Sequence, residues 1–358
     1  MTAEATTDGR ENGSTVLRHG APPQSALAVV RRFGSHADQA IDEQVAAMLR
    51  AELGDVMDIW EAVPRITNNL RINGSNGKIQ AKIKGVYTTM GEISPRRVRN
   101  AIYEVSELLD VRIDEQYPIF SGEYPLDKSR IQIILERACD NPIMVWRRGA
   151  DVAKTFEELA AEGVFTFSQV EFINEAFDAR EKNFVLSGAT DSGKTYNCHG
   201  FMQLFAKYPE RFLLLLEDAK ELLQVSDNVE RLYARRGFGR APDVLMQDCV
   251  EIALRMDPDI IAMGELRTAL AAKALFEAWN TGHSGGFVTY HANSARDSIR
   301  RMDWLLRSAG VIPVPEELAN TLHVLIHVKQ VKPNVRRAVE VVEVTGYKNG
   351  DYVLRHVA

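Results

Sequence analysis

The eight residues GATDSGKT, at positions 188–195, have the types and spacing of a phosphate-binding loop. Glycine, lysine and threonine fill every fixed position of the pattern G-x-x-x-x-G-K-[ST]. In such a loop, backbone N–H groups and the N-terminus of the following helix surround the phosphates, while the lysine reaches the β- and γ-phosphates and the hydroxyl binds Mg²⁺. The sequence therefore predicts a nucleotide site, with Thr195 on the metal, formed by Gly188, Ala189, Thr190, Asp191, Ser192, Gly193, Lys194 and Thr195.

Acidic side chains end two of the apolar runs that follow this loop. Glu217 and Asp218 come directly after FLLLL, with Glu221 one turn further on. Glu265 follows the run IIAM and Gly264, which lets the backbone pass close to a γ-phosphate. Because the carboxyl ends of parallel strands meet at one edge of a sheet, we expect these acids beside the phosphates. Glu265 is the candidate that orients and deprotonates the attacking water, and solvated acids at strand ends are the alternative.

Two histidines flank another short apolar run, in the stretch TGHSGGFVTYHANS. Zinc binding is not expected, because His283 and His291 have no further ligand at HxxxH spacing and no cysteine partner. We expect His291, at the carboxyl end of a strand, to sense the γ-phosphate or to link it to a neighbouring element. A hydrogen-bonded structural role is the alternative, above all for His283.

The segment after residue 165 must position these side chains, and its pattern predicts an α/β unit. A capping-box pattern, Thr166 followed by Gln169, opens a helix there. Short apolar runs then alternate with helix-length periodic segments, as in a parallel sheet with crossover helices. The predicted strands are 184–186, 212–216, 260–263 and 287–289, and a closing hairpin is predicted for 339–344 and 352–355 around Lys348-Asn349-Gly350.

The segment before residue 150 predicts an α+β unit. Apolar residues recur at helical spacing as far as Gly54, which is expected to stop the first helix. Strands and hairpins are expected over 57–90, and Ser94 with Pro95 opens a second helix. Two later apolar runs, RIQIIL and PIMVWR, predict further strands.

These patterns divide the chain into four parts. Residues 1–34 mix small and polar types without the apolar core of a secretion signal, and are predicted to be a disordered tail. Residues 35–150 form the predicted α+β N-terminal domain. The sequence GADVAKTFEELAAEG, at 149–163, lacks a strong apolar stripe, and residues 151–165 are predicted to be a linker and hinge. Residues 166–358 form the predicted α/β domain with the phosphate-binding loop.

Composition excludes several classes of protein. With 45% hydrophobic and 26% charged residues, the 358-residue chain has the balance of a soluble globular protein of roughly two domains. Its apolar runs are too short to cross a bilayer, and its three scattered cysteines fit a reducing cytosol. The net charge of -6 argues against a protein whose main task is to grip nucleic acid.

Taken together, the motifs resemble those of the secretion ATPase superfamily. GATDSGKT, LLLLEDAKEL, DPDIIAMGELR and TGHSGGFVTYHA are similar, in order and spacing, to its Walker A, Asp box, Walker B and His box. The run EAWNTGHSGGFVTYHANSARDSIRRMDWLL and the ending VEVTGYKNGDYVL are most similar to the P-type conjugative transfer branch of type IV secretion traffic ATPases. The similarity is strong over 165–352 and holds only in outline over 40–150.

The resemblance implies a homohexameric ring with an N-terminal tier and a RecA-like P-loop ATPase tier, which uses ATP and Mg²⁺. By motif position it implies catalytic roles for Glu265, Glu217, Lys194 and His291. It also implies an acidic box, a His box and an arginine at the nucleotide. The acidic box is Glu217, Asp218 and Glu221, the His box contains His283 and His291, and the candidate arginines are Arg130, Arg148 and Arg267.

The resemblance further implies a cytoplasmic motor for pilus assembly and substrate transfer. Such a motor docks peripherally at the inner face of the inner membrane, on channel subunits and the coupling ATPase of a type IV secretion apparatus, and direct nucleic-acid binding is not expected. Asp191 departs from the family's usual glycine, which places a negative charge near the phosphates unless the side chain turns outward. The alternatives are a nucleotide-binding regulatory or scaffolding subunit without significant turnover, and a RecA-like DNA translocase.

Overall fold

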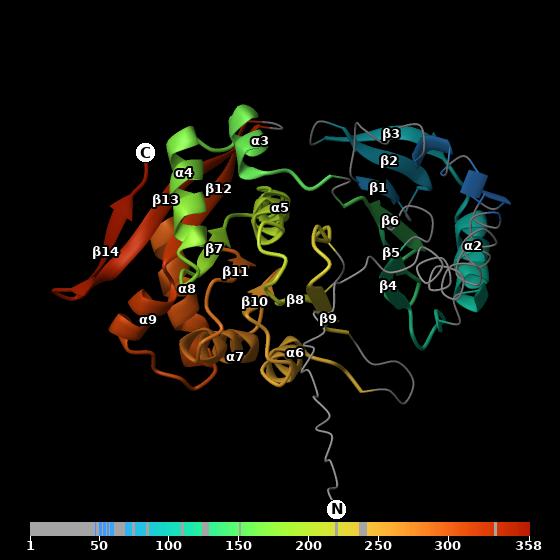
Figure 1. Ribbon diagram of the computed structural model, residues 1–358. Coiled ribbons are helices and arrows are strands. Elements are labelled where there is room, and N and C mark those ends of the chain that lie inside the picture. The colour runs from blue at the N-terminus through green and yellow to red at the C-terminus, as the bar shows by residue number, and fades with distance from the viewer. Residues whose placement is uncertain are drawn as a thin grey trace, which may run out of the picture.

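The computed structural model describes residues 69–358 apart from 74–75, 84–85, 109–110, 124–128, 150–151, 219–220, 236–241 and 333–334, together with helical positions 47, 50–51, 53–54, 56 and 58–60. The tail predicted over 1–34 lies outside the described residues. Within the described part, an N-terminal and a C-terminal β-sheet lie side by side, each with its own apolar core (Figure 1).

The N-terminal sheet consists of β1 Asn69–Ile72, β2 Lys78–Ile83, β3 Val86–Glu92, β4 Ile119–Glu123, β5 Arg130–Ile134 and β6 Ile143–Arg147. The strands are antiparallel, in the order β3-β2-β1-β6-β5-β4. Helix α2, Pro95–Leu108, begins at the predicted Pro95 and packs Val98 and Ile102 into the same apolar cluster as Trp146. The predicted hairpins, second helix and later strands are confirmed, but positions 58–60, predicted to lie among strands, are helical.

The first helix does not stop at Gly54. Gly54 and the described positions as far as Trp60 are helical. Leu53, Val56 and Trp60 recur at i, i+3 and i+7, and at most 1% of each is exposed. Burial of these three side chains outweighs the cost of a glycine inside a helix, about 1 kcal/mol. The predicted stop is therefore wrong, because the apolar spacing continues beyond the glycine.

The C-terminal sheet consists of β7 Phe184–Ser187, β8 Leu213–Glu217, β9 Val229–Tyr233, β10 Ile260–Met263, β11 Phe287–Tyr290, β12 Val324–Lys332, β13 Val335–Lys348 and β14 Asp351–His356. The strand order is β14-β13-β12-β7-β11-β10-β8-β9. The strands from β12 to β9 pair in parallel, and β13 and β14 extend the sheet as antiparallel strands. The predicted closing hairpin is confirmed, with Asn349 and Gly350 at φ 54° and 81° in its turn.

Helices cover both faces of this sheet (Figure 1). They are α3 Phe156–Ala161, α4 Phe167–Asp178, α5 Lys194–Phe205, α6 Met246–Ala253, α7 Ala269–Asn280, α8 Ala295–Ser308 and α9 Pro315–Thr321. Leu213 and Leu215 of β8 pack with α3, α4 and α5, whereas Leu214 and Leu216 pack with the other four helices. The predicted α/β class is confirmed. Among the described helices, none is both long and apolar enough to cross a bilayer.

The stretch 151–165, predicted to be a linker, contains the helix α3 in its central part. A capping box joins the side chains and backbone of Thr155 and Glu158 at the start of this helix. Phe156 is fully buried, and its ring packs edge-to-face on Phe201 of α5 at a centroid distance of 4.9 Å. A helix this short shows little periodicity in the sequence, and its position depends on a partner that lies 45 residues along the chain.

Two strands of the C-terminal sheet, β9 and β12, were not predicted from the sequence. In β9 the sequence VERLY interrupts the apolar pattern with a Glu and an Arg. β12 begins with five buried residues and runs parallel to β7, directly beside the strand that leads into the phosphate-binding loop. Both strands therefore belong to the same sheet as the predicted site.

Candidate functional site

The carboxyl ends of four neighbouring parallel strands bring the predicted site residues together. The phosphate-binding loop follows β7, and His291 follows β11. Glu265 comes two residues after β10, and Glu217 is the last residue of β8. Since these strands are adjacent and parallel, the loop, the histidine and both acids lie at one edge of the sheet, as expected.

The phosphate-binding loop wraps tightly, and two of its glycines are required by the packing. A Cβ on Gly188 would lie 2.4 Å from the carbonyl oxygen of Val328 on β12. Gly193 has a φ of 96°, and a Cβ there would lie 2.6 Å from Cδ of Arg336 on β13. Helix α5 begins at the next residue, so its N-terminus points its free N–H groups into the loop, where an anion is favoured.

Lys194 is almost fully buried and lies inside the loop. Its Nζ donates hydrogen bonds to the carbonyl oxygens of Gly188 and Ala189, each at 3.0 Å, and lies 3.4 Å from Nδ1 of His291. Burial lowers the pKa of the lysine, while the negative charge of Glu265 opposes this shift. A phosphate bound in the loop would offer the ammonium group a stronger partner than the two carbonyls.

Glu265 and His291 form a pair next to the lysine. Oε1 of Glu265 lies 3.3 Å from Nε2 of His291, and Nδ1 of the same ring lies 3.1 Å from the carbonyl oxygen of Gly188. Burial acts to raise the pKa of Glu265, but the hydrogen bond from Arg267, with the charges of Arg267, His291 and Lys194, outweighs it and holds the pKa below its usual value. The carboxylate is therefore ionised and suited to orient a water molecule.

Glu217, predicted to be catalytic, is buried and forms structural hydrogen bonds. It is 2% exposed, and its Oε2 accepts a hydrogen bond from Nη1 of Arg231 at 2.6 Å. Its Oε1 accepts the backbone N–H groups of Glu221 and Leu222 at 3.1 and 3.0 Å. Burial raises the pKa of this carboxyl, while the backbone donors and Arg231 oppose the rise. Both oxygens of Glu217 already accept hydrogen bonds from protein donors. A catalytic base, by contrast, needs an oxygen that is accessible to water.

The other members of the acidic box face the loop and two arginines. Oε2 of Glu221 accepts the hydroxyl hydrogen of Thr195 at 3.2 Å, and Arg130 of β5 forms an ion pair with Oε1. Asp218 pairs with Arg267, 2.6 Å from its Nη1. A hydroxyl and carboxylate oxygens are the hard ligands that Mg²⁺ prefers, so Thr195 and its neighbours fit a nucleotide-bound magnesium ion.

Asp191, at the position where a glycine was expected, turns outward from the loop. Its Oδ2 lies 2.8 Å from Nζ of Lys82 on β2, and its Oδ1 lies 3.6 Å from Nη2 of Arg147 on β6. The carbonyl oxygen of Asp191 accepts a hydrogen bond from Nε of Arg336 at 3.0 Å. The hydrogen bond from Lys82 holds the pKa of the carboxyl below its usual value against the effect of burial. The charge therefore faces the N-terminal sheet.

Two predicted site residues are not brought to this edge. His283 precedes β11, at the opposite end of the strand from His291, and its Nδ1 lies 2.9 Å from the carbonyl oxygen of Pro258. Arg148 lies over the Trp60 ring, 4.0 Å from its centroid, and donates to the Trp60 carbonyl. Both contacts are structural, which for His283 is the alternative that the sequence left open.

Sequence reasoning also missed several residues of the site. Lys82 and Arg147 lie in the N-terminal sheet, more than 40 residues from the loop, and no motif marks them. Arg231 has only a weak signal, since it follows Glu230 in the short run VERLY, which begins with a β-branched residue and ends with an aromatic one. Long-range ion pairs of this kind become visible only when the two sheets are placed together.

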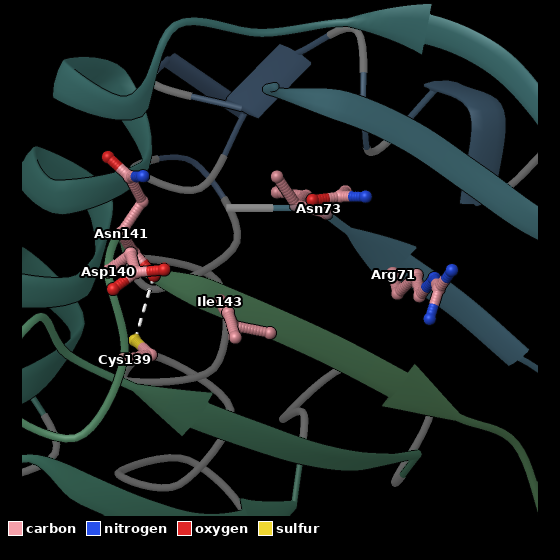
Figure 2. Close-up of a pocket in the computed structure, with 7 residues that line it drawn as sticks. Arg71, Asn73, Cys139, Asp140, Asn141 and Ile143 are labelled. Atoms are coloured by element: carbon pink, nitrogen blue, oxygen red, sulfur yellow. Dashed lines mark hydrogen bonds between the residues drawn. The ribbon is translucent and has the colours of Figure 1, made fainter. Parts of the chain in front are cut away.

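An open pocket of the N-terminal sheet lies apart from this site. Figure 2 shows Arg71 and Asn73, at the end of β1, together with Cys139 and Asn141, which precede β6. Sγ of Cys139 donates to the carbonyl oxygen of Asn141 at 2.8 Å, and Nε of Arg71 donates to Gln80 at 3.1 Å. None of the predicted site residues lines this pocket, so it plays no part in the nucleotide site.

Similar proteins of known sequence carry names from conjugation and secretion. Residues 88–350 match the family model described as Type II/IV secretion system protein. A probable conjugal transfer protein TrbB of Sinorhizobium fredii is 31% identical over 264 residues, which cover 73% of this chain and 78% of that protein. The type IV secretion system protein VirB11 of Bartonella quintana is 30% identical over 235 residues, 55% of this chain and 64% of that protein.

Solved structures show the same architecture. The Legionella pneumophila ATPase DotB has a TM-score of 0.59 at 19% identity, over 81% of this chain and 80% of that one. The pilus retraction motor PilT with bound ADP has a TM-score of 0.56 at 18% identity, over 84% and 81%. These similarities show the fold, an N-terminal domain followed by a RecA-like ATPase domain. Because the family model covers most of the sequence, the chain belongs to the type II/IV secretion system protein family.

Proposed function

We propose that this protein is an ATP-hydrolysing motor that powers a type IV secretion or conjugative transfer apparatus. The observation that carries the proposal is the group formed by Lys194, Glu265 and His291 at the phosphate-binding loop. Hydrolysis requires a cation that binds the phosphates and an ionised carboxylate that orients the water. Lys194 and Glu265 supply these groups, and His291 contacts both of them. The names of the similar proteins support the biological setting.

Each side chain has a distinct task in this proposal. The ammonium group of Lys194 exchanges its loop carbonyls for the β- and γ-phosphates. Glu265 orients the attacking water, and His291, between Glu265 and the loop, links the water to the state of the γ-phosphate. Thr195 and Glu221 are placed to hold Mg²⁺, which would neutralise charge on the phosphates when bound.

The N-terminal unit takes part through ionic contacts with the same site. Lys82 and Arg147 pair with Asp191 in the loop, and Arg130 pairs with Glu221. We propose that residues 35–150 and 166–358 act as two domains that close on ATP and separate after hydrolysis, in a homohexameric ring. Arg130 and Arg267 are the arginines placed to reach the nucleotide.

The proposed partners are proteins at a membrane. We propose peripheral docking at the inner face of the inner membrane, on the channel subunits and coupling ATPase of a type IV secretion apparatus. The net charge of -6 supports protein partners, since direct binding of nucleic acid would require a basic surface.

Hydrolysis assays on three variants test the proposal. Lys194→Ala is expected to weaken nucleotide binding and abolish turnover, whereas Glu265→Gln is expected to bind ATP and lose at least about 100-fold in kcat. Lys273→Ala is the matched control, because the Lys273 side chain on α7 is 42% exposed and pairs with Glu277. If the protein binds nucleotide without hydrolysing it, and Lys194→Ala removes that binding, a regulatory subunit would be favoured. DNA-stimulated hydrolysis at moderate salt would favour a DNA translocase.

A further inference from the structure

Three consecutive backbone N–H groups beside the site are held by two buried side chains. The N–H groups of Glu221 and Leu222 donate to Oε1 of Glu217 at 3.1 and 3.0 Å. The next N–H group, that of Leu223, donates to Nε2 of His199 at 3.2 Å. The segment 221–223 is not part of a regular helix or strand, so these three bonds replace the backbone ladder that would otherwise fix its position.

The two acceptors are themselves fixed by the fold. His199 lies in the middle of α5 and is 1% exposed, and burial lowers its pKa, so the ring is neutral and Nε2 has a free lone pair. Glu217 is oriented by Arg231 of β9, and both side chains are buried. Among the described residues, Nε and Nη2 of Arg231 have no acceptor, so Glu217 is the group that balances this guanidinium.

The segment 221–223 presents one side chain to the magnesium position. Oε2 of Glu221 accepts the hydroxyl hydrogen of Thr195, and Arg130 pairs with the other oxygen. The side chain of Leu222, 1% exposed, anchors the segment in the core of the sheet. If the backbone of 221–223 moved by an ångström, the Glu221 carboxylate would move with it, because its own backbone N–H is one of the three that are held.

We propose that His199 and Arg231 are positioning residues that hold the Glu221 carboxylate against the Thr195 hydroxyl, where nucleotide-bound Mg²⁺ would lie. His199 acts directly on the backbone of Leu223, and Arg231 acts through Glu217. This inference rests on the proposed function for the identity of the ligand. The competing explanation is that both residues only fill space beneath the sheet.

Substitutions at His199 separate the two explanations. His199→Gln retains an acceptor at the position of Nε2, whereas His199→Leu fills the space without one. The matched control is His323→Leu, since His323 is another inward-facing histidine whose Nδ1 accepts a backbone N–H, that of Asn183, at 3.0 Å. That contact precedes β7, at the opposite end of the strand from the phosphate-binding loop.

The first measurement is the Mg²⁺ concentration that gives half of the thermal stabilisation by ATP. We expect it to rise about tenfold in His199→Leu, to stay within about a factor of two of wild type in His199→Gln, and to be unchanged in His323→Leu. Unfolding temperatures without nucleotide show the cost in stability, which we expect to be similar for the two leucine variants. An equal Mg²⁺ requirement in wild type and His199→Leu would overturn the proposal.

The second measurement is amide hydrogen exchange of the protein without nucleotide. Exchange at Leu223 is expected to accelerate by about tenfold or more in His199→Leu and to recover in His199→Gln. For Arg231 we use Arg231→Lys, which keeps the charge and folds more safely than a neutral variant, and we expect faster exchange at Glu221 and Leu222 only. Unchanged exchange in both variants would refute the positioning role.

The two measurements also distinguish this proposal from the proposed function. If the wild-type protein binds Mg²⁺ and ATP but does not hydrolyse ATP, the motor function fails, while the Mg²⁺ requirement and the exchange rates still decide the role of His199 and Arg231. If hydrolysis is observed and neither variant alters exchange or the Mg²⁺ requirement, only the positioning proposal fails.

Discussion

The two sides of the nucleotide site are built in different ways. On the side of the C-terminal sheet, Glu217 and Arg231 form an ion pair whose side chains are 3% and 7% exposed. On the side of the N-terminal sheet, Lys82 and Arg147 reach Asp191 with side chains that are 28% and 50% exposed. The first contact is part of a packed core, whereas the second joins two separate cores through solvent-accessible charges.

This difference indicates which side can move. Breaking a buried pair leaves an uncompensated charge and costs about 3–5 kcal/mol, whereas an exposed pair contributes about 0–1 kcal/mol and is screened by salt. The buried pair of Glu217 and Arg231 is therefore a rigid part of the sheet edge. The N-terminal unit is held on it by contacts weak enough to be rearranged when a nucleotide binds, as a closing domain requires.

The buried side should show the largest effect on stability. Glu217→Gln leaves the Arg231 guanidinium buried without a counter-charge and is expected to lower the free energy of unfolding by about 3–5 kcal/mol. Chemical denaturation measures this change. The double substitution Glu217→Gln with Arg231→Met should recover a large part of the loss, because it removes both charges. A loss below about 1 kcal/mol in Glu217→Gln would mean that the two sides do not differ as we describe.

Glu265 lies between the two sides, and its ionisation should make both hydrolysis and stability depend on pH. Its pKa is lowered in the folded protein, so its contribution to stability is present above the ordinary value of 4.5 and is lost as the pH falls through the lowered folded value. Arg267→Ala removes the hydrogen bond that lowers the pKa, while burial, which raises it, remains. The acid-side loss of hydrolysis should therefore move to higher pH, whereas the part of the stability that is lost on acidification should become smaller.

The control for this shift is Arg300→Ala, since Arg300 is exposed on α8 and pairs with Asp297. An acid-side profile of Arg267→Ala that coincides with that of wild type would contradict the assigned cause of the shift.

The exposed side should show the smallest effect, and salt should remove it. Lys82→Ala is expected to change the free energy of unfolding by less than about 1 kcal/mol at low ionic strength and by less at high ionic strength. Asp191→Asn keeps the shape of the loop residue and should behave in the same way. A change of several kcal/mol in either variant, or one that persists at high salt, would show that the two units are joined more rigidly than these contacts suggest.

Local sequence patterns predicted the C-terminal sheet well, and the first helix less well. The strands of the sheet centre are fully buried and mostly apolar, so their positions follow from burial alone. β9, with its charged residues, and α3, a short helix that buries Phe156 and Leu159, were missed because each is stabilised by partners distant in sequence. Gly54 was given more weight than the apolar positions after it.

The candidate site divides in the same manner. Four of its residues follow parallel strands: Lys194, Thr195, Glu265 and His291. The geometry of a parallel sheet brings them to one edge, independently of the rest of the chain. Glu217 lies there as well, but the sequence does not show that Arg231 and two backbone N–H groups donate hydrogen bonds to its oxygens.

The sequence by itself determined the phosphate-binding loop, the strand ends that carry its partners and the α/β class, because these depend on residue types at short, fixed spacing. Only the tertiary structure decided that Asp191 faces Lys82, that His283 and Arg148 lie away from the site, and that His199 supports the segment next to Glu221. Those outcomes depend on contacts between segments 24 to 109 residues apart, which chain folding brings together and local patterns do not encode.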